Sequence, residues 1–236
     1  MSSFQKQQDG IWNHYQNIDS EKFTQETLGR FRYLLKHIPK GQRICNIGVG
    51  AGQFEKLAAE THDVYCLDPN EESIDTIRRR LNFDSEKAKR GYSSDIPFEE
   101  NFFDSVVMSE VLEHLDDGVI SQTLAEICRV LKPYGFFIGT VPSDENLADN
   151  TVFCPECKQI FHKWGHCQSF DKERLQNLLS KYFEVQKLRD TPLINFKDRP
   201  LRGKLTGLFR LLLYKLKLFK TDGSLFFLAA NCQGKA

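Results

Sequence analysis

Short apolar runs alternate with segments of helical periodicity along the chain from residue 43 onward. The runs hold four to six residues and are bounded by glycine, proline or charged residues, as strands are. Between them, segments such as residues 120–131 repeat apolar side chains at every third or fourth position, which predicts helices with one buried face. The predicted strands are residues 43–47, 64–67, 89–92, 105–108, 136–141, 183–188 and 224–229.

Strands that alternate with helices favour a parallel sheet that is covered on both faces. We therefore predict the α/β class, with a doubly wound, seven-stranded and mostly parallel sheet formed by residues 41–236. Residues 1–40 precede this sheet and predict a helix, because Phe31, Leu34 and Ile38 fall on one face. This N-terminal segment either forms a helical cap over a ligand site or packs as an ordinary helix.

Composition limits the class of partner. The 236 residues contain 32 basic and 32 acidic side chains, so no net charge attracts nucleic acid or an anionic membrane to the chain as a whole. The first ten residues are polar and predict no secretory signal, and no apolar run is long enough to cross a bilayer. We expect a cytoplasmic protein.

The first predicted strand ends in a glycine loop, Gly48-Val-Gly50-Ala-Gly52, and a helix-like stretch follows it. Glycine lets the backbone approach a ligand, and the N–H groups at the start of the next helix face that ligand. A dinucleotide site would carry glycine or alanine where Gln53 stands, which weakens the prediction of an NAD site.

Asp68 ends the second predicted strand and is followed by Pro69. A carboxylate at this edge of a sheet can accept hydrogen bonds from both hydroxyls of a ribose. The alternative is a structural role, in which Asp68 caps the helix that begins at Glu71.

Five segments occur in order along the chain: NIGVGAG at residues 46–52, CLD at 66–68, SDIPF at 94–98, FDSVVMSEVLEHL at 103–115 and RVLKPYG at 129–135. In this order they resemble the class I S-adenosylmethionine (SAM)-dependent methyltransferases, in particular the group that includes small-molecule and quinone-pathway O-methyltransferases. The resemblance implies a Rossmann-like fold and SAM as the cofactor. Asn46 departs from the family pattern, because an acidic residue is usual there and its negative charge near the cofactor is lost.

The resemblance also implies a role for each residue of the site. The glycine backbone would approach the methionine part of SAM, and Asp68 would bind the ribose. Asp95 would accept the adenine amino group, and the Ile96 N–H would meet a ring nitrogen, while Met108 and Ser109 would border the sulfonium. The implied cofactor-binding residues are Asn46, Gly48, Gly50, Gly52, Asp68, Pro69, Asp95, Ile96, Met108 and Ser109.

Methyl transfer from a sulfonium mainly requires an acceptor held about 3 Å from the methyl carbon. A hydroxyl acceptor must also lose a proton, and a histidine with a pKa near neutrality suits that task. His114 is the candidate catalytic base, because the exit of the fourth predicted strand adjoins the cofactor in this fold. Alternatively, Glu113 and His114 belong to a helix end, and proximity alone accelerates the reaction.

Cysteines and histidines cluster between the fifth predicted strand and the next helix. The spacing C-x2-C-x4-H-x4-C is that of a zinc knuckle, and C-x2-C-x4-H-x3-H is also chemically sound. Four of the five residues would form a closed tetrahedral zinc site within residues 151–168, and the alternative is a reduced loop without metal. The candidate ligands are Cys154, Cys157, His162, His166 and Cys167.

Knuckles elsewhere bind single-stranded RNA, and Lys163 and Trp164 would fit that use. The segment is barely basic, however, so nucleic acid is not the expected partner. We expect a zinc site to stiffen a loop beside the substrate mouth.

Residues 201–220 contain six basic residues and no acidic one, and we predict a basic amphipathic helix within residues 200–221. Such a helix lies at an anionic membrane surface or covers a lipid-like acceptor, or else it packs on the sheet or on a second subunit. Packing is the favoured prediction. The apolar stripe consists of Leu205, Leu208, Phe209, Leu212, Leu216 and Phe219.

Together these patterns predict a SAM-dependent methyltransferase that acts on a small or amphipathic acceptor, with oxygen as the expected methylated atom. Two other classes stay open. One is an RNA or protein methyltransferase that docks through the knuckle, and the other is a SAM-binding scaffold without turnover.

Overall fold

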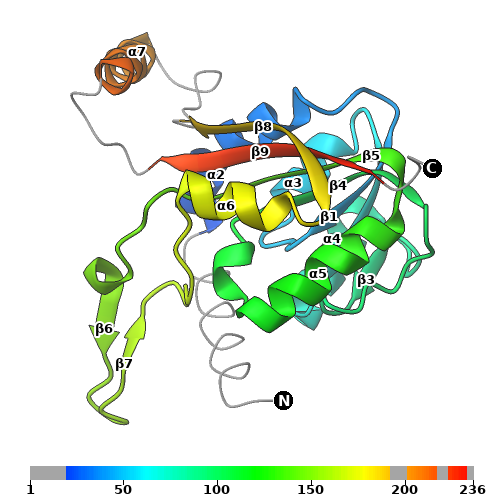
Figure 1. Cartoon of the computed structure of the whole chain (residues 1–236), viewed down its shortest axis with the longest axis horizontal. Coiled ribbons are helices and arrows are strands. Elements are labelled where there is room, and N and C mark those ends of the chain that lie inside the picture. The colour runs from blue at the N-terminus through cyan, green and yellow to red at the C-terminus, as the bar shows by residue number, and fades with distance from the viewer. Residues whose placement is uncertain (1–19, 192–200, 217–222, 233–236) are drawn as a thin grey trace.

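The computed structural model describes residues 20–191, 201–216 and 223–232, and it confirms the predicted seven-stranded sheet (Figure 1). Its strands are β1 (Arg43–Ile47), β2 (Asp63–Asp68), β3 (Ala88–Arg90), β4 (Phe103–Ser109), β5 (Leu131–Pro142), β8 (Phe183–Thr191) and β9 (Ser224–Asn231). They lie in the order β3-β2-β1-β4-β5-β9-β8. The pairs from β3 to β5 are parallel, whereas β9 is antiparallel to both β5 and β8.

Helices cover both faces of the sheet (Figure 1). They are α2 (Ser20–Leu35), α3 (Gln53–Ala58), α4 (Glu71–Leu81), α5 (Asp117–Val130) and α6 (Lys172–Leu179). The other described helical elements are α7 (Leu201–Lys215) and the short 3-10 turns η1 (Leu112–His114) and η2 (Leu147–Asn150). Side chains of β4 point alternately to the two sides, as they do in any strand. Val106 and Met108 join the core beneath α5 and α6, whereas Val107 joins the core beneath α2 and α3.

The described part of the predicted N-terminal helix packs on the sheet and also reaches its functional edge. Leu34 of α2 is completely buried against the sheet. Thr27 Oγ1 donates a hydrogen bond to Gln53 Oε1 (3.4 Å), and Arg30 Nη1 lies 3.9 Å from Glu110 Oε2. Helix α2 therefore contacts residues that directly follow the glycine loop and β4.

Two elements extend from the main sheet. The hairpin of β6 (Thr151–Phe153) and β7 (Ile160–His162) falls within the predicted insertion and projects away from the sheet (Figure 1). Helix α7 is also set apart from the sheet in this view. Within the described ranges, no helix has both the length and the apolar character needed to cross a membrane.

Gly139, in the middle of β5, tests how tightly the central strands pack. A Cβ atom at this position would lie 2.0 Å from the Met108 carbonyl oxygen and 2.5 Å from the Phe227 ring. Since backbone cannot yield as a flexible side chain does, we expect Gly139→Ala to lower the free energy of unfolding by about 1–3 kcal/mol. Urea denaturation measures this change.

The matched control is Gly118→Ala in the first turn of α5. There the added Cβ would lie 3.3 Å from an oxygen of the exposed Asp116 side chain, which can move. Alanine also favours the helix by up to about 1 kcal/mol over glycine. Equal urea midpoints for the two variants would contradict the tight packing at Gly139.

Candidate cofactor and active site

The carboxyl ends of β1, β2 and β4 meet at one edge of the sheet, where ligands of open α/β folds bind. Asp68, the last residue of β2, connects two loops at this edge. Its Oδ2 accepts a hydrogen bond from the Val49 N–H (2.8 Å), and its Oδ1 accepts one from the Asn70 N–H (2.8 Å). Asp68 therefore holds the glycine loop after β1 in place.

The alternative role of Asp68 as a helix cap is not the one observed. Asn70 caps α4, because its side-chain oxygen accepts a hydrogen bond from the Ser73 N–H (2.9 Å). The carbonyl of the intervening Pro69 accepts a hydrogen bond from Arg90 Nε (3.2 Å), which joins the ends of β2 and β3. The Asp68 side chain thus bonds the glycine loop and the Asn70 N–H just before α4, while Asn70 itself caps the helix.

The three glycines of the loop have different surroundings. All three have positive φ angles, but a Cβ atom at Gly48 would lie 2.6 Å from the Val111 side chain and one at Gly52 would lie 2.0 Å from Ile77. A Cβ atom at Gly50 would meet no described atom within 4 Å. A side chain at Gly48 or Gly52 would therefore crowd a neighbouring side chain, whereas Gly50 faces open space that a ligand can fill.

Asn46 lies beside a buried acid that sequence reasoning missed. Its Nδ2 donates hydrogen bonds to Glu55 Oε1 (2.6 Å) and to the Gly48 carbonyl (3.2 Å). Glu55 is completely buried, and this burial raises the pKa of its carboxyl group to about 7. Glu55 thus places a carboxyl group beside Asn46, which itself lacks the acidic group that is usual at its position. The sequence analysis missed Glu55, because nothing in the helix-like stretch after the glycine loop showed that this side chain faces the protein interior.

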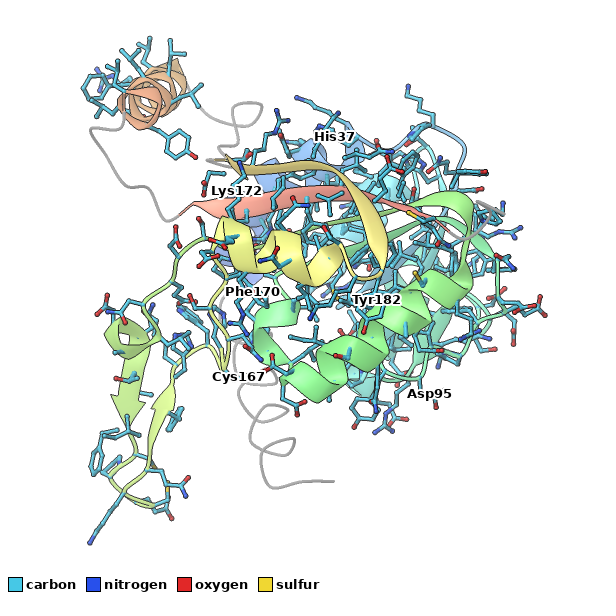
Figure 2. All side chains as sticks on the ribbon, in the orientation of Figure 1. His37, Asp95, Cys167, Phe170, Lys172 and Tyr182 are labelled. Atoms are coloured by element: carbon cyan, nitrogen blue, oxygen red, sulfur yellow. The ribbon has the colours of Figure 1, made fainter. Side chains whose placement is uncertain are left out.

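The segment 95–96 does not take the orientation expected for adenine binding. The Ile96 N–H donates to Glu126 Oε2 (2.8 Å), and the Ile96 side chain is buried in the core. Helix α5 starts near the carboxyl edge of the sheet and runs toward the opposite edge. Glu126 lies in the later half of α5, so its hydrogen bond holds Ile96 toward that opposite edge. Asp95 is exposed. In Figure 2 it lies far from Cys167, whose sulfur contacts the Glu113 carbonyl oxygen in the turn after β4. The Ile96 N–H is therefore engaged within the protein.

The topology places residues other than Asp95 and Ile96 directly after the carboxyl end of β3. Strand β3 ends at Arg90, so Gly91 and Tyr92 directly follow its carboxyl end. Tyr92 is 38% exposed. The sequence analysis missed its position after the strand, because the predicted strand extended over it.

Met108 and Ser109 end β4 as predicted. The Met108 side chain is buried in the core beneath α5, so the residue can present only its backbone to the edge. The Ser109 hydroxyl forms a hydrogen bond with the Thr140 hydroxyl (2.8 Å), which joins the ends of β4 and β5.

The surroundings of His114 do not give it the near-neutral pKa that was expected of a catalytic base. It is buried in η1, and its Nδ1 donates to the Gly165 carbonyl (3.2 Å). Burial first, and the neighbouring His166 second, lower the pKa of His114 to about 3. A group of this pKa stays neutral but binds a proton poorly, so the structure does not support a catalytic base at His114.

The structure does not assemble the predicted zinc knuckle. Cys154 and Cys157 lie at the turn of the hairpin, while His162 pairs with Thr151 at its open end. A rise of three residues, about 10 Å of backbone, separates the two positions. The groups of potential ligand atoms that lie close together among the described residues contain neither cysteine of the pair. Cys167 lies elsewhere, with its sulfur 3.5 Å from the Glu113 carbonyl oxygen.

His162 and His166 instead lie against one acidic side chain, that of Glu145. His166 Nδ1 lies 2.5 Å from Glu145 Oε2, and His162 Nε2 lies 3.3 Å from Glu145 Oε1. Glu145 was not predicted, because it is 17 residues or more from either histidine in the sequence. Among the described residues, the groups of potential metal ligands that lie close together contain histidine and glutamate and no cysteine.

The raised pKa of Glu55 predicts a pH effect on stability. Between about pH 4.5 and 7 the folded protein keeps this proton and the unfolded chain has lost it, so raising the pH favours unfolding. We expect stability to fall by up to about 3 kcal/mol from pH 5 to pH 8 relative to Glu55→Gln, which cannot ionise. Urea unfolding at both pH values measures the difference.

The control is Glu60→Gln, the same change at an exposed position just after α3, which should keep the wild-type pH dependence. Parallel pH profiles for the wild type and Glu55→Gln would contradict the burial of an ionisable Glu55.

Part of the chain is similar to known methyltransferases. Residues 45–139 match a family model described as a methyltransferase domain. The mitochondrial ubiquinone biosynthesis O-methyltransferase of Homo sapiens is 33% identical over 150 residues, which are 56% of this chain and 40% of the relative. The fatty-acid O-methyltransferase of Mycolicibacterium smegmatis is 34% identical over 104 residues, which are 43% of this chain and 37% of the relative. The chain thus spans about two fifths of the length of these curated relatives.

A solved structure has the same fold over nearly the whole chain. Phosphoethanolamine N-methyltransferase 2 of Haemonchus contortus, in complex with SAM, aligns with a TM-score of 0.64 at 18% identity. The alignment covers 99% of this chain and 61% of that chain. The glycine loop, Asp68 and the exit of β4 all fall within residues 45–139 and meet at one edge of this seven-stranded sheet, so the candidate site lies in the segment that matches the methyltransferase domain, and the chain has the Rossmann-like fold of class I methyltransferases.

Proposed function

We propose that this protein transfers a methyl group from SAM to an oxygen atom of a small, amphipathic acceptor of lipid-like character. The observation that carries the cofactor assignment is the loop after β1, which Asp68 holds with Gly50 facing open space. A loop of this kind lets the backbone approach the cofactor closely. Oxygen as the acceptor atom is favoured by relatives named as O-methyltransferases of ubiquinone biosynthesis and of fatty acids.

The reaction would depend mainly on positioning. In-line displacement at a sulfonium methyl needs little covalent help, and good alignment can supply about 7–11 kcal/mol of the barrier. The low pKa of His114 agrees with this view, because an imidazole of this pKa takes up a proton poorly. The loops after β1, β2 and β4 would supply the alignment.

Helix α7 favours an acceptor that is presented at a lipid surface. The predicted packing of its apolar stripe on the sheet is not observed for the described residues, because five side chains are 53–60% exposed: Leu205, Leu208, Phe209, Leu212 and Leu216. Phe219, the sixth member, lies outside the described residues. Six basic and no acidic residues in 201–220 complement anionic headgroups. We infer that α7 holds the enzyme at an anionic membrane surface.

Cofactor binding is tested by substitution of Asp68. We expect Asp68→Ala to weaken binding of SAM and S-adenosylhomocysteine at least tenfold, because the glycine loop loses its acceptor and the ribose loses its carboxylate. Asp68→Asn should lose less, since its amide oxygen can still accept one N–H. Isothermal titration calorimetry measures both affinities.

Asp63→Ala is the matched control, because Asp63 is the acid at the opposite end of the same strand and pairs there with Lys87 (2.7 Å). It should bind SAM as the wild type does. Unchanged affinity in Asp68→Ala would refute the site. Wild-type protein with methyl-labelled SAM and a lipid extract should yield a labelled product; binding without product would favour the scaffold alternative.

Membrane binding is tested by flotation with vesicles. The wild type should float with phosphatidylglycerol vesicles and not with phosphatidylcholine vesicles, and Phe209→Glu with Leu212→Glu should abolish flotation. Tyr134→Glu is the control, since Tyr134 is 61% exposed on the main body and should not matter. Wild-type protein that stays in the aqueous fraction with both lipids would reject the membrane proposal but not the enzyme.

A further inference from the structure

Histidine and glutamate side chains form a cluster between the exit of β4 and the segment after β7. The ligand atoms of Glu113, His114 and His166 lie within 4.8 Å of one another. The His166 ring packs edge-on against His114, with 4.7 Å between centroids, and nearly parallel to His162 at 4.6 Å. Glu113 and His114, which are 53 and 52 positions from His166 in the sequence, thus lie beside it in the fold.

Hydrogen bonds determine which ring nitrogen each histidine can offer to a ligand. His114 Nδ1 must donate to the Gly165 carbonyl (3.2 Å), because a carbonyl oxygen only accepts. His166 Nδ1 donates to the Glu145 carboxylate (2.5 Å). In both rings Nδ1 is thus engaged, and Nε2 is the nitrogen that can coordinate a metal ion. Metal-binding histidines characteristically donate their other N–H to a carbonyl or carboxylate in this way.

His162 is oriented differently and belongs to the support of this site. Its Nδ1 accepts the His166 backbone N–H (3.0 Å), so the ring proton is on Nε2, which faces Glu145 Oε1 at 3.3 Å. Asn150 Nδ2 donates to the same carboxylate oxygen (3.0 Å). His162 and Asn150 therefore hold Glu145, and Glu145 in turn orients His166.

Glu113 supplies the carboxyl group of the cluster. Its side chain is 1% exposed, and neither carboxyl oxygen has a hydrogen-bond partner among the described residues. Burial of a carboxylate without a hydrogen-bond partner is costly. A cation bound between Glu113, His114 and His166 would offset that cost.

We propose that Glu113, His114 and His166 bind one divalent transition-metal ion, with zinc as the expected metal. Two imidazole nitrogens and one carboxylate are a common ligand set for such ions, and they leave a coordination position open for water or another oxygen ligand. This site differs in ligands and in openness from the closed knuckle predicted from the cysteines. It also lies at the carboxyl end of β4, on the edge where the cofactor loops meet.

The backbone holds the third ligand in position. The Glu113 carbonyl oxygen accepts hydrogen bonds from the N–H groups of Cys167 (2.9 Å) and Gln168 (3.1 Å). These bonds fasten the segment after β7 to η1 and place His166 beside Glu113 and His114. The insertion thus contributes a metal ligand through its base, while its cysteine pair lies away at the turn.

The site is tested on the full-length protein after removal of metal with a chelator. Titration with Zn²⁺ against a chromogenic competitor should show one tightly bound ion per chain. Glu145→Gln should weaken Zn²⁺ binding about 10- to 100-fold, because it removes the group that orients His166. Glu113→Gln and His166→Ala, which remove ligands, should weaken it further. If His166→Ala fails to fold, the nearly isosteric Glu113→Gln still reports on the site.

The matched control is the double variant Cys154→Ser and Cys157→Ser, which should bind Zn²⁺ as the wild type does. Co²⁺ in place of Zn²⁺ should give visible absorption without a thiolate-to-cobalt charge-transfer band. A thiolate band, loss of Zn²⁺ in the cysteine variant, or absence of stoichiometric Zn²⁺ from the wild type would each overturn the proposal. SAM affinity, measured separately, distinguishes failure of this site from failure of the proposed function.

Discussion

The Asp68 carboxylate is the interaction on which the geometry of the functional edge depends. Its two oxygens accept N–H groups from Val49 and Asn70, so one side chain ties the loop after β1 to the loop after β2. Backbone donors that lie away from water need such partners, and the glycine loop has a positive φ at Gly48, Gly50 and Gly52. With the loop held in this form, Gly50 faces the space that a cofactor can occupy.

Buried ionisable groups gather around the same edge. Glu55 lies beneath the glycine loop, and its Oε1 accepts a hydrogen bond from Asn46. Glu113 lies beneath the exit of β4 and next to two histidines. Fully buried acids of this kind reduce stability when they are charged, so their presence indicates a requirement other than packing. Glu55 restores acidity near the loop, and Glu113 provides the charge for a bound cation in the proposed metal site.

The two elements added to the central fold differ in what they contribute. The hairpin projects from the sheet, but the chain that leaves it returns to the interior and brings His166 against His114. Helix α7 lies apart from the sheet and exposes a stripe of apolar side chains. In the proposed function, the first element completes the interior of the site and the second brings the enzyme to a lipid-like acceptor.

The sequence by itself determined the sheet, its mostly parallel pairing and the place of the glycine loop and Asp68, because local periodicity and strand order suffice for these features. Strand β1 has the predicted bounds. Only the tertiary structure decided which distant side chains meet. It turned the Ile96 N–H to Glu126, buried His114 beside His166, brought Glu145 to both histidines, and left Cys154 at the hairpin turn. Spacing along the chain reports candidate ligands, but hairpin register and burial decide whether their atoms converge and what their pKa values become.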